Sequence, residues 1–464
     1  MAAARSWSSQ KRGSPIFCSS SVRRAASRSG SKVITDPRQA GSDLLELLLQ
    51  RLCVLLGHVA MVAKLGSDPE GSDPSGWVVR TKSHRRRDLG SGQVGCHAKI
   101  VLTPHRITVG VCTLLGAFAC SATPADADRN NYRAAVSYWA MQHTFLDRAQ
   151  GVYREESGRG GTARAWPYSQ ALAATLAMTS VPGRGRLYVP DAARRVSGLD
   201  GYLRRDGAFA SVMGPKGDVY YDDNEWIALE LLRWYDVRSA PRALARAQRL
   251  FKLVVSAWDA VVTHACPGGV FWTTAPGNRD RNTVTTATGA LLGLELYERT
   301  HDPTQLAWAQ RMLGWVTTCM LAPDGLLWDH IALDGTRDDT HWSYNQGTAI
   351  GANVLLYQLT GDKDALVRAE ALADSSLAYF DRTPGGREPA FFLAIWFRNL
   401  LALESVDGDA RYRDALQEYA DAVWDRLRDQ STGLFHFDGS RSAKLLEQAA
   451  MVQIYASLAV PRPS

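Results

Sequence analysis

From residue 130 onward the chain alternates two kinds of predicted helix, and this alternation limits the fold more than any other feature. One kind is amphipathic: between residues 241 and 260, Leu244, Ala247 and Phe251 recur at helical spacing, with arginines between them. The other kind is apolar on nearly every face, which is typical of a helix buried on all sides. Amphipathic helices are expected at about 132–154, 190–205, 241–260, 303–320, 363–380 and 409–428. Apolar helices are expected at about 166–180, 222–236, 285–300, 345–359, 390–404 and 444–459.

A short motif of glycine, an apolar residue and usually an aromatic residue marks the period of this repeat. It begins at Gly151, Gly207, Gly269, Gly325 and Gly433, at spacings of 56, 62, 56 and 108 residues. The last spacing is twice 54, so one unit lacks a clear copy. Six units of two helices predict an all-α fold, an (α/α)6 barrel with an outer ring around an inner ring. An open α-solenoid is the alternative.

The chain changes character before this repeat region. Residues 1–125 hold 17 Lys and Arg against 7 Asp and Glu, whereas the remainder holds 36 against 40. Residues 1–98 are basic and rich in Ser, Arg and Gly, which predicts a disordered extension or one translated from an over-extended reading frame. The barrel domain is expected at 126–464, and its slightly acidic balance argues against a nucleic-acid partner.

Residues 99–125 combine a basic start, an apolar core and a small-residue exit. Lys99 and Arg106 precede the apolar run 107–119, and residues 120–125 are mostly small. The pattern predicts a secretory signal peptide, with a single membrane span as the alternative. A secreted or cell-surface protein follows from it. Only Cys266 and Cys319 lie beyond residue 125, so the barrel has material for one disulfide.

Two adjacent carboxylates, Asp222 and Asp223, stand at the start of the apolar helix predicted from residue 222. Charged carboxylates are costly to bury unless a partner or a function requires them. Helix capping is the simpler explanation of such a pair. Paired carboxylates among aromatic residues are also what hydrolysis of a glycosidic bond needs, because one group attacks and the other moves a proton.

In a barrel of this kind the inner helices all begin at the same end. Carboxylates, amides and aromatic rings gather at those helix starts, a combination typical of a carbohydrate site. The polar residues are Asp222, Asp223, Asn224, Thr285, Thr286, Tyr344, Asn345 and Gln346, and the aromatic residues near them are Trp166, Tyr220, Tyr221, Trp272, Trp328 and Trp342.

Four sequence blocks carry a resemblance to a known family. They are the run Tyr-Tyr-Asp-Asp-Asn-Glu-Trp at 220–226, Trp-Ser-Tyr-Asn-Gln-Gly at 342–347, Gly-Gly-Val-Phe-Trp at 268–272 with 281–285, and Ile-Trp-Phe-Arg-Asn-Leu at 395–400. Over about residues 130–460 the chain resembles glycoside hydrolase family 76, the α-1,6-mannanases. Two positions depart from the family pattern: Thr286 stands where Asn is usual, and Leu393 stands where Lys is usual.

The resemblance implies a retaining endo-hydrolase that cleaves α-1,6-mannosidic bonds in mannan. It implies Asp222 as the nucleophile and Asp223 as the general acid/base, although the order of the two roles stays open. The substrate-binding residues expected with them are Tyr221, Asn224, Trp272, Arg281, Thr285, Tyr344, Asn345 and Gln346.

No cofactor and no metal are expected. No Cys/His group has zinc spacing, and residues 222–225 lack the spaced ligands of a calcium loop. The expected partner is a polysaccharide or oligosaccharide, bound by a monomer. Three alternatives remain. An isomerase on the same barrel type would favour His pairs at the inner-helix starts, where His264, His330 and His341 do not recur. A transglycosidase acting on a mannose-containing cell-wall glycan would give longer products when an acceptor is added. A non-catalytic glycan-binding protein would release no product.

Overall fold

The structure is a computed structural model that describes residues 78–79, 102–103, 124–214 and 216–462. The chain divides into two compact units. In one, strands β1 (Val78–Val79) and β2 (Leu102–Thr103) form an antiparallel pair. The other contains all twelve α-helices of the described residues. The predicted 1–98 extension and signal-like segment 99–125 fall almost wholly outside the described residues. No helix within the described residues is long and apolar enough to cross a membrane.

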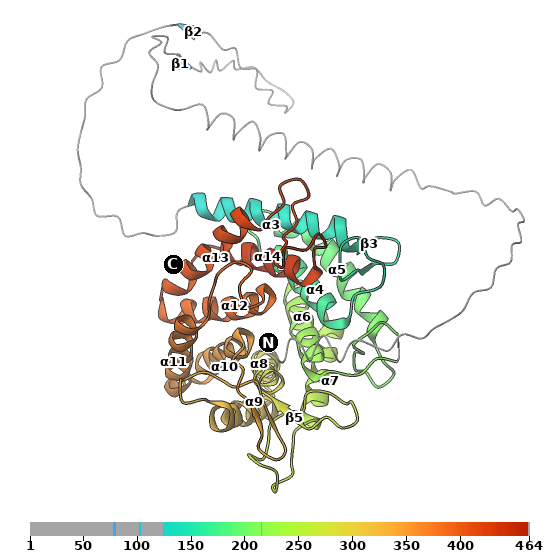
Figure 1. Ribbon diagram of the computed structural model, residues 1–464, viewed down its shortest axis with the longest axis vertical. Helices are drawn as coiled ribbons and strands as arrows, with labels where there is room; N and C mark the ends of the chain where they lie inside the picture. Colours follow the sequence, from blue (N-terminus) through green and yellow to red (C-terminus); the bar gives the residue numbers. More distant parts are fainter. Residues whose placement is uncertain (1–77, 80–101, 104–123, 215, 463–464) are drawn as a thin grey trace, which may run out of the picture. The chain divides into compact units, whose positions relative to one another are not determined.

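Six helices form a closed inner ring (Figure 1). They are α4 (Ala165–Thr179), α6 (Tyr221–Arg238), α8 (Thr283–Thr300), α10 (Ser343–Thr360), α12 (Ala390–Asp407) and α14 (Leu445–Ala459). Each contacts the next, and α14 contacts α4, so the ring closes. An open solenoid has no such final contact, and the predicted all-α (α/α)6 barrel is confirmed.

Six further helices form the outer ring, alternating with the inner ones along the chain. They are α3 (Pro124–Phe145), α5 (Val189–Gly198), α7 (Pro241–Ser256), α9 (Pro303–Trp315), α11 (Lys363–Tyr379) and α13 (Arg411–Arg426). Asp302 and Asp362 cap α9 and α11, because their carboxylates accept hydrogen bonds from backbone N–H groups at the starts of these helices. Asp409, one residue before the N-cap of α13, accepts from Arg411 N.

The outer helices differ from the sequence prediction mainly at their ends; α3 begins at Pro124 and not at about residue 132, and α7 ends at Ser256 and not at about residue 260. The first outer helix was expected to reach residue 154 but ends at Phe145, and β3 (Leu146–Asp147) then pairs with β4 (Val152–Tyr153). The Asp147 carboxylate accepts from the N–H groups of Ala149 and Gln150, which favours a turn over a further helical turn. α5 is flanked by the 3-10 helices η1 (Gly185–Tyr188) and η2 (Leu199–Tyr202), and the π-helical turn η3 (Val316–Met320) follows α9.

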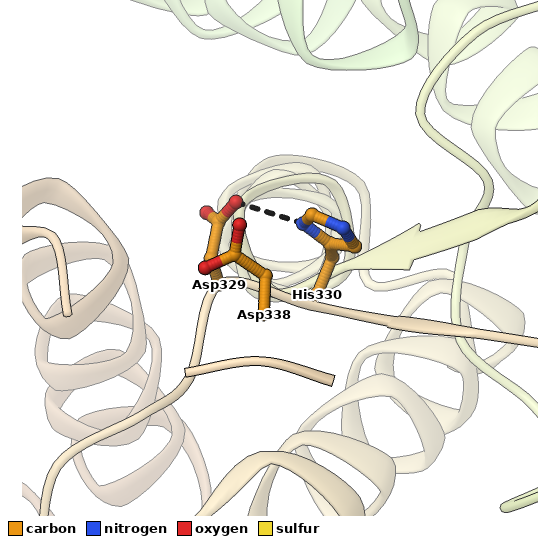
Figure 2. Close-up of side chains that lie close together, drawn as sticks. All are labelled: Asp329, His330 and Asp338. Carbon is orange, nitrogen blue, oxygen red and sulfur yellow. Dashed lines mark hydrogen bonds and ion pairs between the residues drawn. The ribbon is translucent and has the colours of Figure 1, made fainter. Parts of the chain in front are cut away.

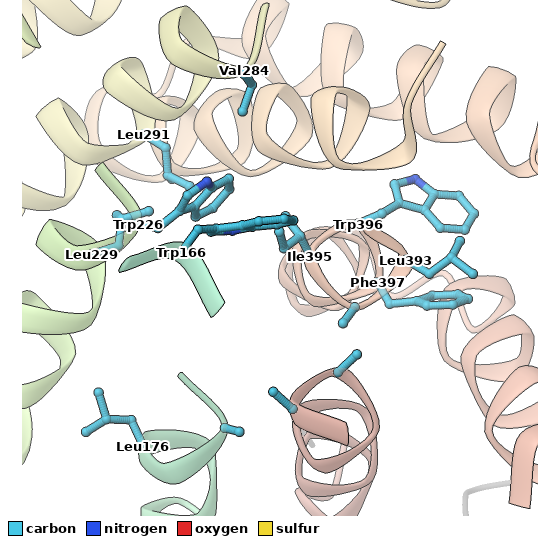
Figure 3. Packing of buried hydrophobic residues seen from close by; sticks show 14 of the residues in the cluster. Trp166, Leu176, Trp226, Leu229, Val284, Leu291, Leu393, Ile395, Trp396 and Phe397 are labelled. Atoms are coloured by element: carbon cyan, nitrogen blue, oxygen red, sulfur yellow. The ribbon is translucent and has the colours of Figure 1, made fainter. Parts of the chain in front are cut away.

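Buried apolar side chains fill the layer between and within the rings (Figure 3). Trp226 and Trp396 of the inner helices are at most 2% exposed. Outside the rings, β5 (Asp280–Asn282), β6 (His330–Ala332) and β7 (Arg337–Asp338) form a small antiparallel sheet. A disulfide joins Cys266 to Cys319, as the sequence allowed.

Candidate active site

The second residue of every inner helix lines a single cleft of about 610 Å³. These six residues are Trp166, Asp222, Val284, Tyr344, Phe391 and Leu446. The regularity arises because the inner helices present equivalent first turns to the same end of the barrel. Helix N-termini carry unpaired N–H groups and partial positive charge, so negative groups are stabilised there.

Asp222 and Asp223 enter this cleft from the first turn of α6. Asp223 is buried, and Asp222 accepts a hydrogen bond of 3.2 Å from the indole nitrogen of Trp272. The Tyr220 ring packs against Trp272 at 5.1 Å, and burial together with nearby aspartates raises the pKa of Tyr220 to about 12. Tyr220 therefore keeps its proton at neutral pH, and it packs against the tryptophan that donates a hydrogen bond to Asp222.

Glu225 lies one turn further along α6, behind the carboxylate pair. It is fully buried, and burial, helped by the charge of Asp222, raises its pKa well above the ordinary value. An alanine at position 289 of α8 would place its Cβ 3.0 Å from Glu225 Oε1, so Gly289 leaves the room that this side chain occupies. Glu225 therefore lies outside the cleft lining, in surroundings that favour its protonated form.

One side of the cleft is aromatic, and we call Trp166, Trp342, Tyr344, Phe391 and Phe392 the aromatic wall. Tyr344 and Phe392 stack with ring centroids 4.0 Å apart, and Trp342 meets Phe392 edge-on at 5.5 Å. Aromatic rings that line a cleft are surfaces on which the C–H face of a sugar ring can pack.

A second side is acidic, and we call Asp280, Asp329, His330 and Asp338 the acidic wall. Asp329 is buried; its Oδ2 lies 2.9 Å from His330 Nδ1, and its Oδ1 accepts from Asn345 Nδ2 at 3.1 Å. Burial lowers the pKa of His330, but the hydrogen bond to Asp329 and the charges of all three aspartates outweigh it, and the net shift is upward.

The third side carries paired charges from the first and last units. Arg164 and Glu155 form an ion pair at 2.6 Å, and Lys444 lies 4.0 Å from Glu447. Burial raises the pKa of Glu447 to about 7, although Lys444 opposes this. The cleft as a whole therefore presents an excess of acidic groups over cations.

Amide side chains at the fourth position of three inner helices bind the backbone of the loop that precedes each helix and do not line the cleft. Asn224 accepts from Phe209 N and donates to Phe209 O; Gln346 does the same with Leu327, and Gln448 with Phe435. We call these three side chains the amide clamps. Each forms hydrogen bonds with the backbone of the last residue of a Gly-apolar-aromatic motif. This contact explains why that motif recurs with the period of the barrel.

The departure from the family pattern at Thr286 has a physical explanation in α8. Thr286 Oγ1 accepts from Val270 N at 3.0 Å, and Thr285 Oγ1 donates to Val270 O at 2.9 Å. In α8 the hydroxyl of Thr286 thus takes the place of the amide oxygen of a clamp, and the hydroxyl of Thr285 takes the place of its N–H donor. Thr285 is consequently buried behind the cleft lining.

Arg281 also serves the scaffold. Its side chain is fully buried, and its guanidinium binds Asp259 at 2.9 Å and the carbonyl oxygens of Ala265, Cys266 and Ala332. It fixes the disulfide loop to β6 and contributes nothing to the cleft lining.

The structure brings four of the ten expected site residues together in the cleft lining: Asp222, Asp223, Trp272 and Tyr344. Asn345 lies behind it, bonded to Asp329. Tyr221, Asn224, Arg281, Thr285 and Gln346 are outside the lining. The sequence did not single out the following lining residues: Glu155, Arg164, Asp280, Asn282, Asp329, Phe391, Phe392, Lys444 and Glu447. Phe391 could have been predicted, because the second residue of every inner helix lines the cleft. The lining residues from strands and loops follow no such rule in the sequence.

A closed helical barrel with adjacent carboxylates in an aromatic cleft defines a class of carbohydrate-processing proteins. The model of one family, described as Glycosyl hydrolase family 76, matches residues 131–453. The chain belongs to glycosyl hydrolase family 76, as its sequence blocks indicated.

Proteins similar to this chain include mannosidases and mannanases. A mannan endo-1,6-α-mannosidase of Saccharomyces cerevisiae is 26% identical over 149 residues, which are 30% of this chain and 32% of that protein. The match thus spans about a third of the length of this curated relative. A family 76 mannosidase structure from Bacteroides thetaiotaomicron has a TM-score of 0.66 at 24% identity, covering 71% of this chain and 98% of that one.

A third similar protein is an α-1,6-mannanase from Salegentibacter sp. HEL1_6, in complex with α-1,6-mannotriose. It is an inactive variant in which two consecutive aspartates are replaced by asparagine. The TM-score is 0.61 at 23% identity, over 71% of this chain and 99% of that one. Likenesses at this level of identity establish a common fold.

Proposed function

We propose that the protein is a retaining endo-glycosidase that cleaves α-1,6-mannosidic bonds in mannan. The observation that carries the proposal is the placement of Asp222 and Asp223 side by side in an aromatic cleft. Family membership supports the reaction class, and the names of the similar mannanases support the substrate.

In the proposed mechanism Asp222 attacks the anomeric carbon and Asp223 protonates the departing glycosidic oxygen. Asp223 then takes a proton from water, which releases the sugar from Asp222 with its configuration retained. The Trp272 N–H donates to Asp222, and a donated hydrogen bond of this kind stabilises a carboxylate anion. Neighbouring side chains in a first helical turn diverge by about 100°, which allows the separation of about 5–5.5 Å that retention requires.

The test is incubation with linear α-1,6-mannan while product sizes and the anomeric configuration of the first product are followed. We expect short mannooligosaccharides released with the α configuration, and no release by Asp222→Asn or Asp223→Asn. Asp218→Asn is the matched control, since Asp218 is exposed and outside the cleft lining.

Three results would contradict the proposal in different ways. Products of β configuration would mean inversion. Products longer than the substrate after addition of an oligosaccharide acceptor would mean transfer to sugar. Activity that survives Asp222→Asn and Asp223→Asn would place the chemistry elsewhere.

We further propose that the protein works outside the cytoplasm, as a monomer. The Cys266–Cys319 disulfide supports this location, because such bonds persist in oxidising compartments. Alkylation before and after reduction, followed by mass measurement of the protein purified from its source, tests the disulfide, and light scattering tests the monomer. Two free thiols in the native protein would argue against secretion.

A further inference from the structure

Three strands outside the helical rings place ligand-type side chains on one face. In the antiparallel sheet Asn282 lies opposite His330, and His330 lies opposite Asp338. Directly opposed residues of antiparallel strands project to the same side of a sheet. Asp329 immediately precedes β6 and joins this face through its contact with His330 (Figure 2).

We propose that Asp329, His330 and Asp338 form a binding site for a divalent metal ion, of the Mn²⁺ or Zn²⁺ type. One ligand atom from each residue lies within 4.8 Å of the others. Ligands bonded to one ion at about 2.0–2.2 Å are at most about 4.4 Å apart, so small side-chain rotations complete the shell. Two carboxylates with one imidazole are suitable ligands for Mn²⁺ or Zn²⁺, whereas Ca²⁺ and Mg²⁺ prefer sites built of oxygen ligands alone.

Asn282 supplies an independent sign of a ligand. Its side chain is 6% exposed and belongs to the cleft lining. Within the described part of the chain, its Oδ1 has no hydrogen-bond donor. A buried amide oxygen without a partner costs about 1–3 kcal/mol, and an ion held by the neighbouring His330 and Asp338 would give this oxygen a partner.

Surrounding groups hold the proposed ligands in place. Asn345 Nδ2 donates to Asp329 Oδ1, and Thr340 N donates to Asp338 Oδ1, at 3.1 and 3.0 Å. Such second contacts orient metal ligands and are part of ordinary metal sites. An ion would take the place of the proton that His330 Nδ1 and Asp329 Oδ2 share in the metal-free protein.

The ion would lie in the acidic wall of the cleft, where three carboxylates face one imidazole. A divalent ion offsets this excess of negative charge. Since Asp329, His330 and Asp338 all line the cleft, the remaining coordination positions open toward it and accept water or a hydroxyl group. This proposal does not depend on the mannanase activity, because metal binding can be measured without substrate.

The experiment titrates chelator-treated protein with Mn²⁺, and separately with Zn²⁺, by calorimetry. We expect one ion per chain. Asp338→Asn and His330→Ala should each weaken binding at least about 100-fold, since loss of an outer contact alone weakens it about 10–100-fold. The matched control is Asp334→Asn, an exposed aspartate of the same β6–β7 hairpin, which should bind as the parent does.

Two results would overturn the proposal: no binding of either ion at millimolar concentration, or equal binding by Asp338→Asn and Asp334→Asn. If a variant fails to fold, anomalous diffraction from parent crystals soaked in Mn²⁺ decides the matter. A peak among Asp329, His330 and Asp338 supports the site, and a peak only elsewhere on the protein rejects it.

Discussion

The indole nitrogen of Trp272 donates a hydrogen bond to Asp222 Oδ2, although the two residues are 50 positions apart. The backbone reinforces this contact, because Tyr221 N donates to Trp272 O at 2.9 Å. The loop after α7 and the start of α6 are therefore fixed to each other at the carboxylate pair. Asp222 is held in one orientation by a residue from the next repeat unit.

Trp272→Phe should lower kcat by about 10–100-fold while leaving the fold intact. A hydrogen bond to a charged group contributes about 1.5–3 kcal/mol, and each 1.36 kcal/mol is a factor of ten in rate. Phe keeps an aromatic face in the cleft, so KM should change less than kcat. Steady-state kinetics on α-1,6-mannan provide the measurement. Trp328→Phe, which alters a tryptophan outside the cleft lining, is the control; an equal loss of activity in both variants would refute a specific role for Trp272.

Gln448→Leu should destabilise the barrel by about 2–6 kcal/mol, and Gln346→Leu by about 1–3 kcal/mol. Gln448→Leu leaves the buried N–H and C=O of Phe435 without their partner, and each such group costs about 1–3 kcal/mol. Gln346→Leu leaves only the N–H of Leu327 without its partner, because the C=O of Leu327 also lies 2.9 Å from His341 Nδ1. Urea denaturation measures the change, with the exposed Gln150→Leu as control. The folded fraction of Gln346→Leu should keep the parent KM. A raised KM with unchanged stability would instead assign Gln346 to substrate binding.

Glu447→Gln should reduce the dependence of stability on pH between about 4.5 and 7, to which Glu388, whose pKa burial also raises to about 7, contributes as well. The pKa of Glu447 rises from 4.5 in the unfolded chain to about 7 in the folded protein. The folded state therefore binds the extra proton, and its stability falls as pH rises through this window, by up to about 3 kcal/mol. Thermal melts from pH 4.5 to 8 measure the slope. Glu418→Gln, at an exposed glutamate of α13, should retain the parent slope, and the prediction fails if Glu447→Gln retains it too.

Replacing both disulfide cysteines by serine should cost about 4 kcal/mol of stability. The bridge closes a loop with a sequence separation of 53, and loop-closure entropy of the unfolded chain gives this magnitude. Melting temperatures with and without reductant provide the measurement. The parent should lose stability on reduction, and the double variant should be insensitive to reductant. A fully reduced parent that melts at its original temperature would contradict the expectation.

The helical architecture was predictable from the sequence because hydrophobic periodicity reports directly on burial. All twelve helices lie where the amphipathic and apolar stretches predicted them, with the main errors at the ends of the first two outer helices. There, local hydrogen bonds of Asp147 and a 3-10 turn after Gly198 decided the boundary, and neither depends on periodicity.

The cleft was predictable only in part, because sequence shows where a residue stands on the chain and not which way it faces. Asn224 and Gln346 stand at helix starts, as Asp222 and Tyr344 do, but their position two residues later turns them toward the backbone of the preceding loop. Asp329 could not be foreseen as a lining residue. Its place depends on a three-stranded sheet whose strands are two or three residues long.

The closure of the ring also governs how the barrel can be built. α14 lies between α12 and α4 and packs on α3, so α3 meets its main partner, and α4 its second inner-ring neighbour, only after the last helix of the ring has left the ribosome. Until then the apolar flank of α4 that packs against α14 remains uncovered, which exposes a nascent chain to aggregation. A premature stop ahead of α14 would leave the opening unit without neighbours on one side. The ring can therefore close only after its last helix has been synthesised.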